Sequence, residues 1–191
     1  SDLARVVAHD APCAALLALA PVKCEVEEAA AGRALTDAEV ARLLLACRSD
    51  PSREVGVRDE AIIRVLWATG FRRETLCKLD LADLDLTAST VTARGKGRKR
   101  HVMPLDADTL TVLRDYLEVR GDWAGPLFVG ATPGKPPHRL TRRPFRPDAL
   151  YEMLLRRGTE AGVERFTPHD LRRTAVTQWI AQVGLRTAQR L

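Results

Sequence analysis

The chain has 191 residues, of which 46 % are hydrophobic, 29 % charged and only 5 % aromatic. This composition excludes a disordered protein, and the length is sufficient to bury an aliphatic core without disulfides or metals. The formal net charge is +5, but residues 1–93 carry 11 basic and 15 acidic side chains, whereas residues 94–191 carry 19 basic and 10 acidic ones. The basic C-terminal half predicts a polyanionic partner such as nucleic acid.

Cysteine spacing and hydropathy exclude further classes. The four cysteines and four histidines form no zinc-binding pattern, which predicts free thiols in a reducing compartment and no metal. The longest apolar stretch, within residues 11–22, contains a proline and is too short to span a bilayer. No basic run precedes it, as a signal peptide would require. We therefore expect a cytoplasmic protein without a membrane partner.

The N-terminal part predicts helices after a poorly patterned start. Residues 1–34 have weak periodicity and are expected to form an arm or linker with a short helix near residues 14–19. The first firm helix follows a capping box from Thr36 to Glu39. A second helix is predicted over residues 57–68 and ends at Gly70, and a short third one covers residues 73–79.

The remaining elements predict a mainly α fold with a small antiparallel β-sheet, an α+β class. Alternating residues around the Gly95–Gly97 turn indicate a β-hairpin with a third short strand near residues 84–86. Asp106 caps a helix that runs to about Arg120. Residues 121–147 are rich in proline and glycine, which predicts an exposed loop with a short strand at 127–129. Helices follow at about 148–161, from Pro168 to about residue 182 with Thr167 as N-cap, and from residue 185.

Three separated segments carry side chains suited to binding one phosphate. Arg72 directly follows a helix-stopping glycine, where the backbone can approach a ligand closely; the alternative is a surface arginine. Lys96 lies between two glycines at the hairpin tip, from which it can reach into a groove; the alternative is a solvated tip. His169 and Arg172 share one face near a helix N-terminus; the alternative is an ordinary polar face. Together these four side chains would stabilise a phosphorane transition state without a metal.

These segments, ATGFRRETLCKLDLADLDL, RGKGRKRHVMPL and TPHDLRRTAVTQ, resemble the catalytic domain of the tyrosine recombinases, the phage-integrase and Xer-like family. They occur in the family's order and with similar spacing, and the resemblance runs from about residue 34 to the C-terminus. It implies DNA cleavage and rejoining through a 3′-phosphotyrosyl intermediate, without a cofactor. Arg72 and Arg172 would clamp the nonbridging oxygens, His169 would assist, and Lys96 would protonate the leaving 5′-oxygen.

The chain departs from the family pattern in two respects. The acid that usually follows the first arginine by three positions is replaced by Thr75, and Glu74 lies one place earlier, about 100° away on a helix. The chain also stops at Leu191, before the family's nucleophilic tyrosine, and neither Tyr116 nor Tyr151 fits that role. We therefore expect residues 1–34 to be a linker with a remnant of an N-terminal DNA-clamping domain. Residues 35–191 would form a catalytic domain that is incomplete at its C-terminus and inactive in cleavage.

The resemblance implies a double-stranded recombination site as partner, together with other protomers in a tetramer on DNA. Nine further basic side chains are expected to contact DNA: Arg73, Arg98, Lys99, Arg100, Arg139, Arg142, Arg143, Arg146 and Arg173. One alternative is a truncated relative that binds DNA without cutting it. Another is a type IB topoisomerase-like enzyme, although the short hairpin and HDLRRT fit the recombinases better.

Overall fold

The computed structural model describes residues 32–95, 100–164 and 166–183. The helices expected near residues 14–19 and from residue 185 lie outside them, as do Lys96, Arg98 and Lys99. The described part is mainly helical with two small antiparallel sheets, which confirms the α+β class. Its elements are α2 (Asp37–Arg48), α3 (Arg53–Thr69), α4 (Arg73–Cys77), η1 (Leu81–Asp83), β1 (Leu84–Asp85), β2 (Thr90–Arg94), β3 (Arg100–Pro104), α5 (Ala107–Arg120), β4 (Val129–Ala131), β5 (Leu140–Pro144), α6 (Pro147–Glu160) and α7 (Pro168–Val183).

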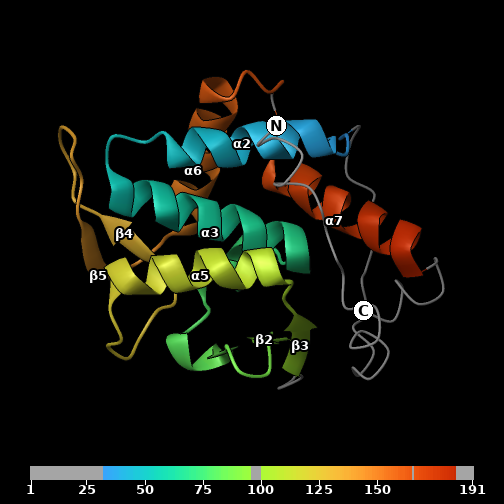
Figure 1. Cartoon of the computed structure of the whole chain (residues 1–191), viewed down its shortest axis with the longest axis horizontal. Helices are drawn as coiled ribbons and strands as arrows, with labels where there is room; N and C mark the ends of the chain where they lie inside the picture. Colours follow the sequence, from blue (N-terminus) through green and yellow to red (C-terminus); the bar gives the residue numbers. More distant parts are fainter. Residues whose placement is uncertain (1–31, 96–99, 165, 184–191) are drawn as a thin grey trace.

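Helix α3 lies at the centre of the molecule. Helices α2, α5 and α7 pack against it, and α6 packs against α2 and α4 (Figure 1). Helix α7 lies at one end of this layer, β4 and β5 lie at the other, and the β1–β2–β3 sheet lies beneath α5 (Figure 1). Ile62, Ile63 and Leu66 of α3 are at most 1 % exposed, because neighbours cover the helix on all sides.

A network of buried charges joins α3 to α6. The Asp59 carboxylate is fully buried and accepts hydrogen bonds from Arg58, Arg156 and Arg157 at 2.7–3.0 Å. Arg157 also donates to Asp50 at 2.5 Å. Buried charges remain ionised only when they are paired in this way. The sequence pattern identified the apolar residues of α3 but did not show that its charged residues are buried as well.

Most of the helix starts that the sequence predicts are confirmed, but the second helix begins at Arg53 rather than at residue 57. An additional turn forms there because the carbonyl of Ser52 accepts from the N–H groups of Val55 and Gly56 at 2.9 and 3.0 Å. Thr36 and Glu39 form the capping box of α2, and the Asp106 side chain accepts from the backbone N–H of Thr109 at the start of α5. Helix α7 begins at Pro168. Helix α4 ends at Cys77, earlier than residue 79, because the following segment becomes extended. There the carbonyl of Leu79 accepts from the N–H of Leu127 at 2.7 Å.

The predicted hairpin is confirmed, and its third strand is β1. Strands β2 and β3 pair with Thr92 opposite Val102, and β1 lies on the other edge of β2. The loop expected over residues 121–147 is wrong in part, because β4 and β5 form a second sheet there. Strand β4 also begins at Val129 rather than at residue 127. Charged residues and Pro144 conceal β5 in the sequence, yet Pro is tolerated in such an edge strand.

The turn between α5 and β4 is built around one cation. The Arg120 guanidinium donates to the backbone carbonyls of five residues at 2.7–3.3 Å, and it stacks on the Trp123 ring at 4.0 Å. The five residues are Gly121, Trp123, Gly125, Pro126 and Leu127. The indole N–H of Trp123 donates in turn to the carbonyl of Arg120 at 2.8 Å. This turn is therefore organised by a side chain rather than by its own backbone hydrogen bonds.

Within the described ranges, no helix is long and apolar enough to cross a membrane. No group of three or more His, Cys, Asp or Glu side chains in those ranges is placed to hold a metal ion. Cys47 and Cys77 are buried free thiols, as the sequence predicts, whereas Cys13 and Cys24 lie outside the described residues.

Candidate functional site

Arg72 lies in the turn between α3 and α4. Gly70 ends α3 with φ +58°, and Phe71 is buried beneath the turn. The hydroxyl of Thr69 donates to the carbonyl of Val65 at 2.6 Å and accepts from the N–H of Phe71 at 3.3 Å. Arg72 then stands in extended conformation as the N-cap residue of α4, with its side chain exposed. These hydrogen bonds of Thr69, together with the buried Phe71, fix the backbone just before Arg72.

His169 and Arg172 lie in the first turns of α7. The N–H and the hydroxyl of Thr167 both donate to Oδ2 of Asp170 at 2.8 Å, which fixes the start of the helix. His169 is exposed, Arg172 is half-buried, and their spacing of three residues places them on one face. Both therefore lie near the helix N-terminus, where the backbone dipole favours an anion.

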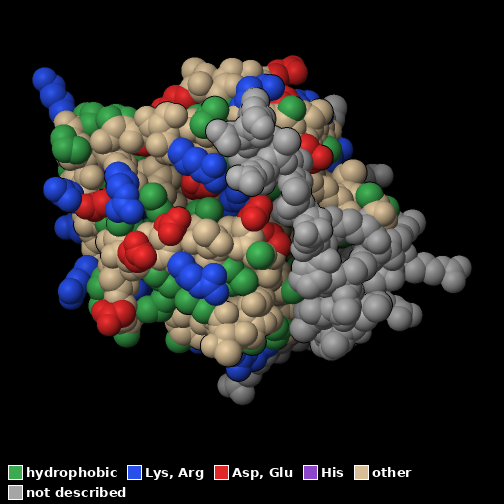
Figure 2. Space-filling view, viewed as in Figure 1, with side chains coloured by type: hydrophobic (Ala, Val, Ile, Leu, Met, Phe, Trp, Pro, Cys, Tyr) green, Lys and Arg blue, Asp and Glu red, His purple; other side chains and the backbone are tan. Residues whose placement is uncertain are grey.

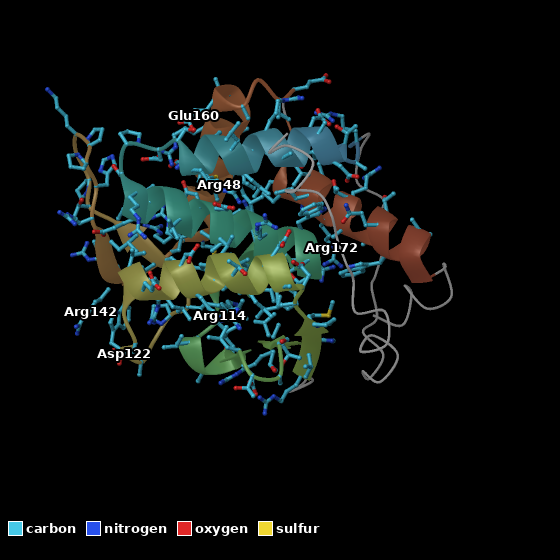
Figure 3. The ribbon with its side chains drawn as sticks, viewed as in Figure 1. Arg48, Arg114, Asp122, Arg142, Glu160 and Arg172 are labelled. Atoms are coloured by element: carbon cyan, nitrogen blue, oxygen red, sulfur yellow. The ribbon has the colours of Figure 1, made fainter. Side chains whose placement is uncertain are left out.

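The structure brings the first and third sequence segments together. Nη1 of Arg172 donates to the carbonyl of Gly70, two residues before Arg72. Figure 3 shows Arg172 beside the C-terminal end of α3. A Cβ at Gly70 would lie 3.2 Å from Cη2 of Trp179 and 3.5 Å from Cβ of Ala175. Glycine is thus required there both for its positive φ and for the close approach of α7.

The displaced acid, Glu74, pairs with Arg73. Nε of Arg73 donates to Oε1 of Glu74 at 2.6 Å. Partial burial alone would raise the pKa of Glu74, but the hydrogen bond from Arg73 and the charges of Arg73 and His169 lower it below its ordinary value. The acid at position 74 therefore pairs with Arg73, and its carboxylate also interacts electrostatically with His169.

The stem of the hairpin reaches the same region. Glu74, Thr75 and Lys78 of the α4 region line a hollow of about 310 Å³, together with Arg94 at the end of β2. Lys96, which is two residues beyond Arg94, lies outside the described residues. The described end of the second segment, Arg94, therefore lies near α4. The position of the Lys96 side chain stays a prediction.

The other predicted DNA-contacting residues fall into two groups. Arg73 and Arg173 lie on α4 and α7, and Arg100 faces Arg94 across the hairpin. The second group lies on or next to β5 and comprises Arg139, Arg142, Arg143 and Arg146. Figure 2 shows Lys and Arg side chains gathered at the edge formed by β4 and β5, and Figure 3 places Arg142 at the opposite end of the molecule from Arg172. Arg98 and Lys99 lie outside the described residues.

Two members of the second group have partners that the sequence did not predict. Oε1 of Glu54 accepts from Arg139 at 2.6 Å, so that arginine is already charge-paired. The Trp123 ring lies 5.4 Å from the Arg142 guanidinium, within the range of a cation–π contact. No local spacing could reveal the pair with Glu54, because 85 residues separate the partners.

The two tyrosines occupy different environments. Tyr116 is fully buried; its hydroxyl donates to the carbonyl of Leu127 at 3.0 Å, and burial raises its pKa to about 12. Tyr116 is thus a core residue. Tyr151 is half-buried on α6, one turn after Asp148.

The chain is similar to tyrosine recombinases in sequence and in fold. It is 34 % identical to tyrosine recombinase XerC of Corynebacterium glutamicum over 144 residues, which cover 73 % of this chain and 44 % of the relative. It is 30 % identical to XerA of Pyrococcus furiosus over 161 residues, 83 % of this chain and 52 % of that one. It thus spans about half the length of these relatives. A crystal structure of XerA recombinase superposes with a TM-score of 0.69 at 29 % identity, and covers 83 % of this chain and 55 % of its own.

More distant structures share the fold. A lambda integrase fragment bound to a core site superposes with a TM-score of 0.64 at 17 % identity, and covers 85 % of this chain and 57 % of its own. The family model described as "Phage integrase family" matches residues 33–191. These matches in sequence are to tyrosine recombinases and not to type IB topoisomerases, the weaker alternative drawn from the sequence. The chain therefore belongs to the phage integrase family of tyrosine recombinases.

Proposed function

We propose that this chain is the DNA-binding catalytic domain of a site-specific recombinase that cleaves and rejoins duplex DNA through a 3′-phosphotyrosyl intermediate. The observation that carries the proposal is the hydrogen bond from Arg172 to the carbonyl of Gly70. Because of it, the two segments that hold the proposed arginines meet in space. We propose a cytoplasmic location, where such a protein meets its DNA.

Each residue of the site has a role in this proposal. Arg72 and Arg172 hold the nonbridging oxygens of the scissile phosphate, and charge-assisted bonds to these oxygens strengthen as negative charge develops. His169 donates a hydrogen bond or transfers a proton from the N-terminus of α7. Lys96 protonates the leaving 5′-oxygen, because a general acid on the hairpin can approach that atom. No step requires a metal or a cofactor.

In our proposal, contacts to the DNA backbone lie both beside this site and at the β5 end of the molecule. Arg73, Arg100 and Arg173 stand near it, with Arg98 and Lys99 at the hairpin tip. Arg139, Arg142, Arg143 and Arg146 form the surface at the β5 end. Partner protomers complete an assembly on the recombination site. The structural relatives include a lambda integrase tetramer bound to a Holliday junction, which supports an assembly of this kind. We also retain the prediction that residues 1–34 are a linker that precedes a catalytic domain over residues 35–191.

Salt-dependent DNA binding is the direct test. Affinity for a fluorescein-labelled duplex is measured by anisotropy over a series of KCl concentrations. If about five phosphates are contacted, log K falls with log salt at a slope of roughly −4 to −5. An affinity that does not change with salt would contradict the proposal.

A nicked suicide substrate tests the source of the nucleophile. Duplexes that the chain itself selects from a random pool are nicked, incubated with the protein and resolved on a denaturing gel. We expect no covalent adduct from these 191 residues alone, because Tyr116 is buried and hydrogen-bonded and Tyr151 lies in a helix of mixed polarity. An adduct that Tyr151→Phe abolishes would contradict this expectation. An adduct formed only after a full-length relative is added would show that a partner supplies the tyrosine.

A further inference from the structure

We propose that the segment leading into α2, residues 32–37, positions α7, the helix that carries His169 and Arg172, and that Thr174 is the positioning residue through which it acts. This lead-in segment contacts the face of α7 that lies away from the arginine site. The inference rests on the proposed function, since it concerns how the site formed by His169 and Arg172 is held.

Thr174 is the centre of the contact. It is 2 % exposed, and its hydroxyl makes two hydrogen bonds. The hydroxyl accepts from the N–H of Leu35 at 2.8 Å and donates to the carbonyl of Asp170 at 2.7 Å. One turn further along α7, Nε2 of Gln178 donates to Oδ1 of Asp37 at 3.2 Å. Asp170, Thr174 and Gln178 thus form a polar stripe at intervals of four residues along the helix.

Gly32 packs against Asp170, the first residue of this stripe. A Cβ at Gly32 would lie 2.3 Å from Oδ1 of Asp170, so no side chain fits unless this carboxylate moves. The same carboxylate accepts from both the N–H and the hydroxyl of Thr167 and thereby fixes the start of α7. The lead-in segment therefore packs directly against the cap that precedes His169.

The lead-in segment is itself anchored. Arg33 donates to both carboxylate oxygens of Glu39, at 2.8 and 2.7 Å, and to the carbonyl of Glu164 at 3.3 Å. It thus joins the first turn of α2 to the loop before α7. Because the lead-in segment is bonded both to α2 and to the loop before α7, it can hold α7 in place rather than move with it.

Two opposite faces of α7 contact different parts of the molecule, one the end of α3 and the other the lead-in segment. At about 100° per residue, the centre of the polar stripe lies roughly 170° around the helix from the midpoint of His169 and Arg172. Arg172 bonds to Gly70 at the end of α3, while Thr174 bonds to the lead-in segment. Helix α7 is therefore clamped from both sides. Because a helix moves as a rigid body, release of the stripe would shift His169 and Arg172 relative to Arg72.

The central experiment is Thr174→Val, a change that keeps the side-chain shape and removes both hydrogen bonds. Inorganic phosphate serves as the probe, with binding followed through the imidazole NMR signal of His169. We expect phosphate to bind about three- to tenfold more weakly, as loss of a buried hydrogen bond would give if its effect reached the site. Thr174→Ser keeps the hydroxyl and is expected to restore the affinity.

Gly32→Ala approaches the same contact from the other partner, so the test does not depend on a single variant that fails to fold. It should weaken phosphate binding in the same direction by displacing the Asp170 carboxylate. Gly130→Ala is the matched control, because its Cβ would meet nothing closer than 3.6 Å. Thermal unfolding of each variant separates loss of stability from loss of affinity at a temperature where all variants are folded.

The outcomes distinguish this inference from the function on which it rests. Phosphate binding that survives both Thr174→Val and Gly32→Ala would overturn the positioning role and leave the proposed function standing. A folded wild-type chain that binds neither phosphate nor duplex DNA would overturn the proposed function, and this inference with it.

Discussion

The two ends of the molecule present arginine in different ways. At the α7 end, Arg172 is half-buried and its guanidinium is directed by a backbone carbonyl at the end of α3. At the β5 end, Arg142, Arg143 and Arg146 are exposed on or beside an edge strand. The first arrangement suits one anion held in a defined geometry, and the second supplies a field along a polyanion. Arginine content alone does not distinguish these two uses.

The largest effect is expected from the buried charge network that joins α3 to α6 between the two ends. Asp59→Ala would leave Arg58, Arg156 and Arg157 without their shared carboxylate. We expect the free energy of unfolding to fall by about 3–5 kcal/mol in urea titrations. Asp115→Ala, at an exposed position on α5, is the control and should change it by less than about 0.5 kcal/mol. An equal effect of the two changes would show that the buried network contributes nothing.

The next test compares phosphate binding by an arginine from each end of the molecule. Arg172→Ala should weaken phosphate binding about 10- to 100-fold, because a charged hydrogen bond to an anion is lost. Arg142→Ala, at the β5 end, should leave it within about twofold. Isothermal titration measures both variants. If the two lose affinity equally, the ends do not differ in the way that the structure indicates.

DNA binding should show the reverse pattern. Replacing both Arg142 and Arg143 with Gln should make the salt slope of duplex affinity shallower by about two units, while phosphate affinity is retained. Arg139→Gln should have a smaller effect, because Glu54 already pairs with Arg139. Anisotropy over a KCl series measures each slope. A larger change from Arg139 than from the pair would contradict this assignment.

The smallest effect concerns the anchor of the lead-in segment and depends on pH. The hydrogen bond from Arg33 outweighs the effect of burial and lowers the pKa of Glu39 to about 2, below its usual 4.5. Its contribution to stability is therefore present above about pH 4.5 and is lost as the pH falls towards 2. After allowance for solvent screening, Glu39→Gln should cost about 1 kcal/mol at pH 7. This difference in unfolding free energy should shrink towards zero at pH 2; a constant difference would exclude the ion pair as its source.

The sequence predicted the fold where the signals are local. The caps at Thr36 and Asp106, the helix stop at Gly70 and the pairing of the two hairpin strands each depend on residues that are close in sequence. The structure confirms all of them. Strand β5 was missed because its backbone is held from outside: Glu54 accepts from the N–H of Leu140 at 2.8 Å across 86 positions. Long-range partners of this kind leave no periodic trace in a sequence.

In the candidate site, too, the features that depend on nearby residues could be predicted and the long-range contacts could not. The spacing of His169 and Arg172 is local, so their shared face could be predicted. The sequence also predicted the helix start at Thr167, but it did not assign a role to Asp170, whose carboxylate accepts from Thr167. The T-x-x-D spacing of the two residues resembles a capping box and could have indicated that role. The contact between Gly32 and Asp170 joins segments 138 positions apart and could come only from the structure.

The Arg120 turn links the end of α5 to the path of the chain that follows. Its five carbonyls converge on a cation that is covalently part of α5, so the same hydrogen bonds hold the native turn and the last residue of that helix. The turn leads the chain towards β4, with which β5 pairs. A metal ion would perform a similar task in a loop of this kind, but it could dissociate; the tethered guanidinium cannot.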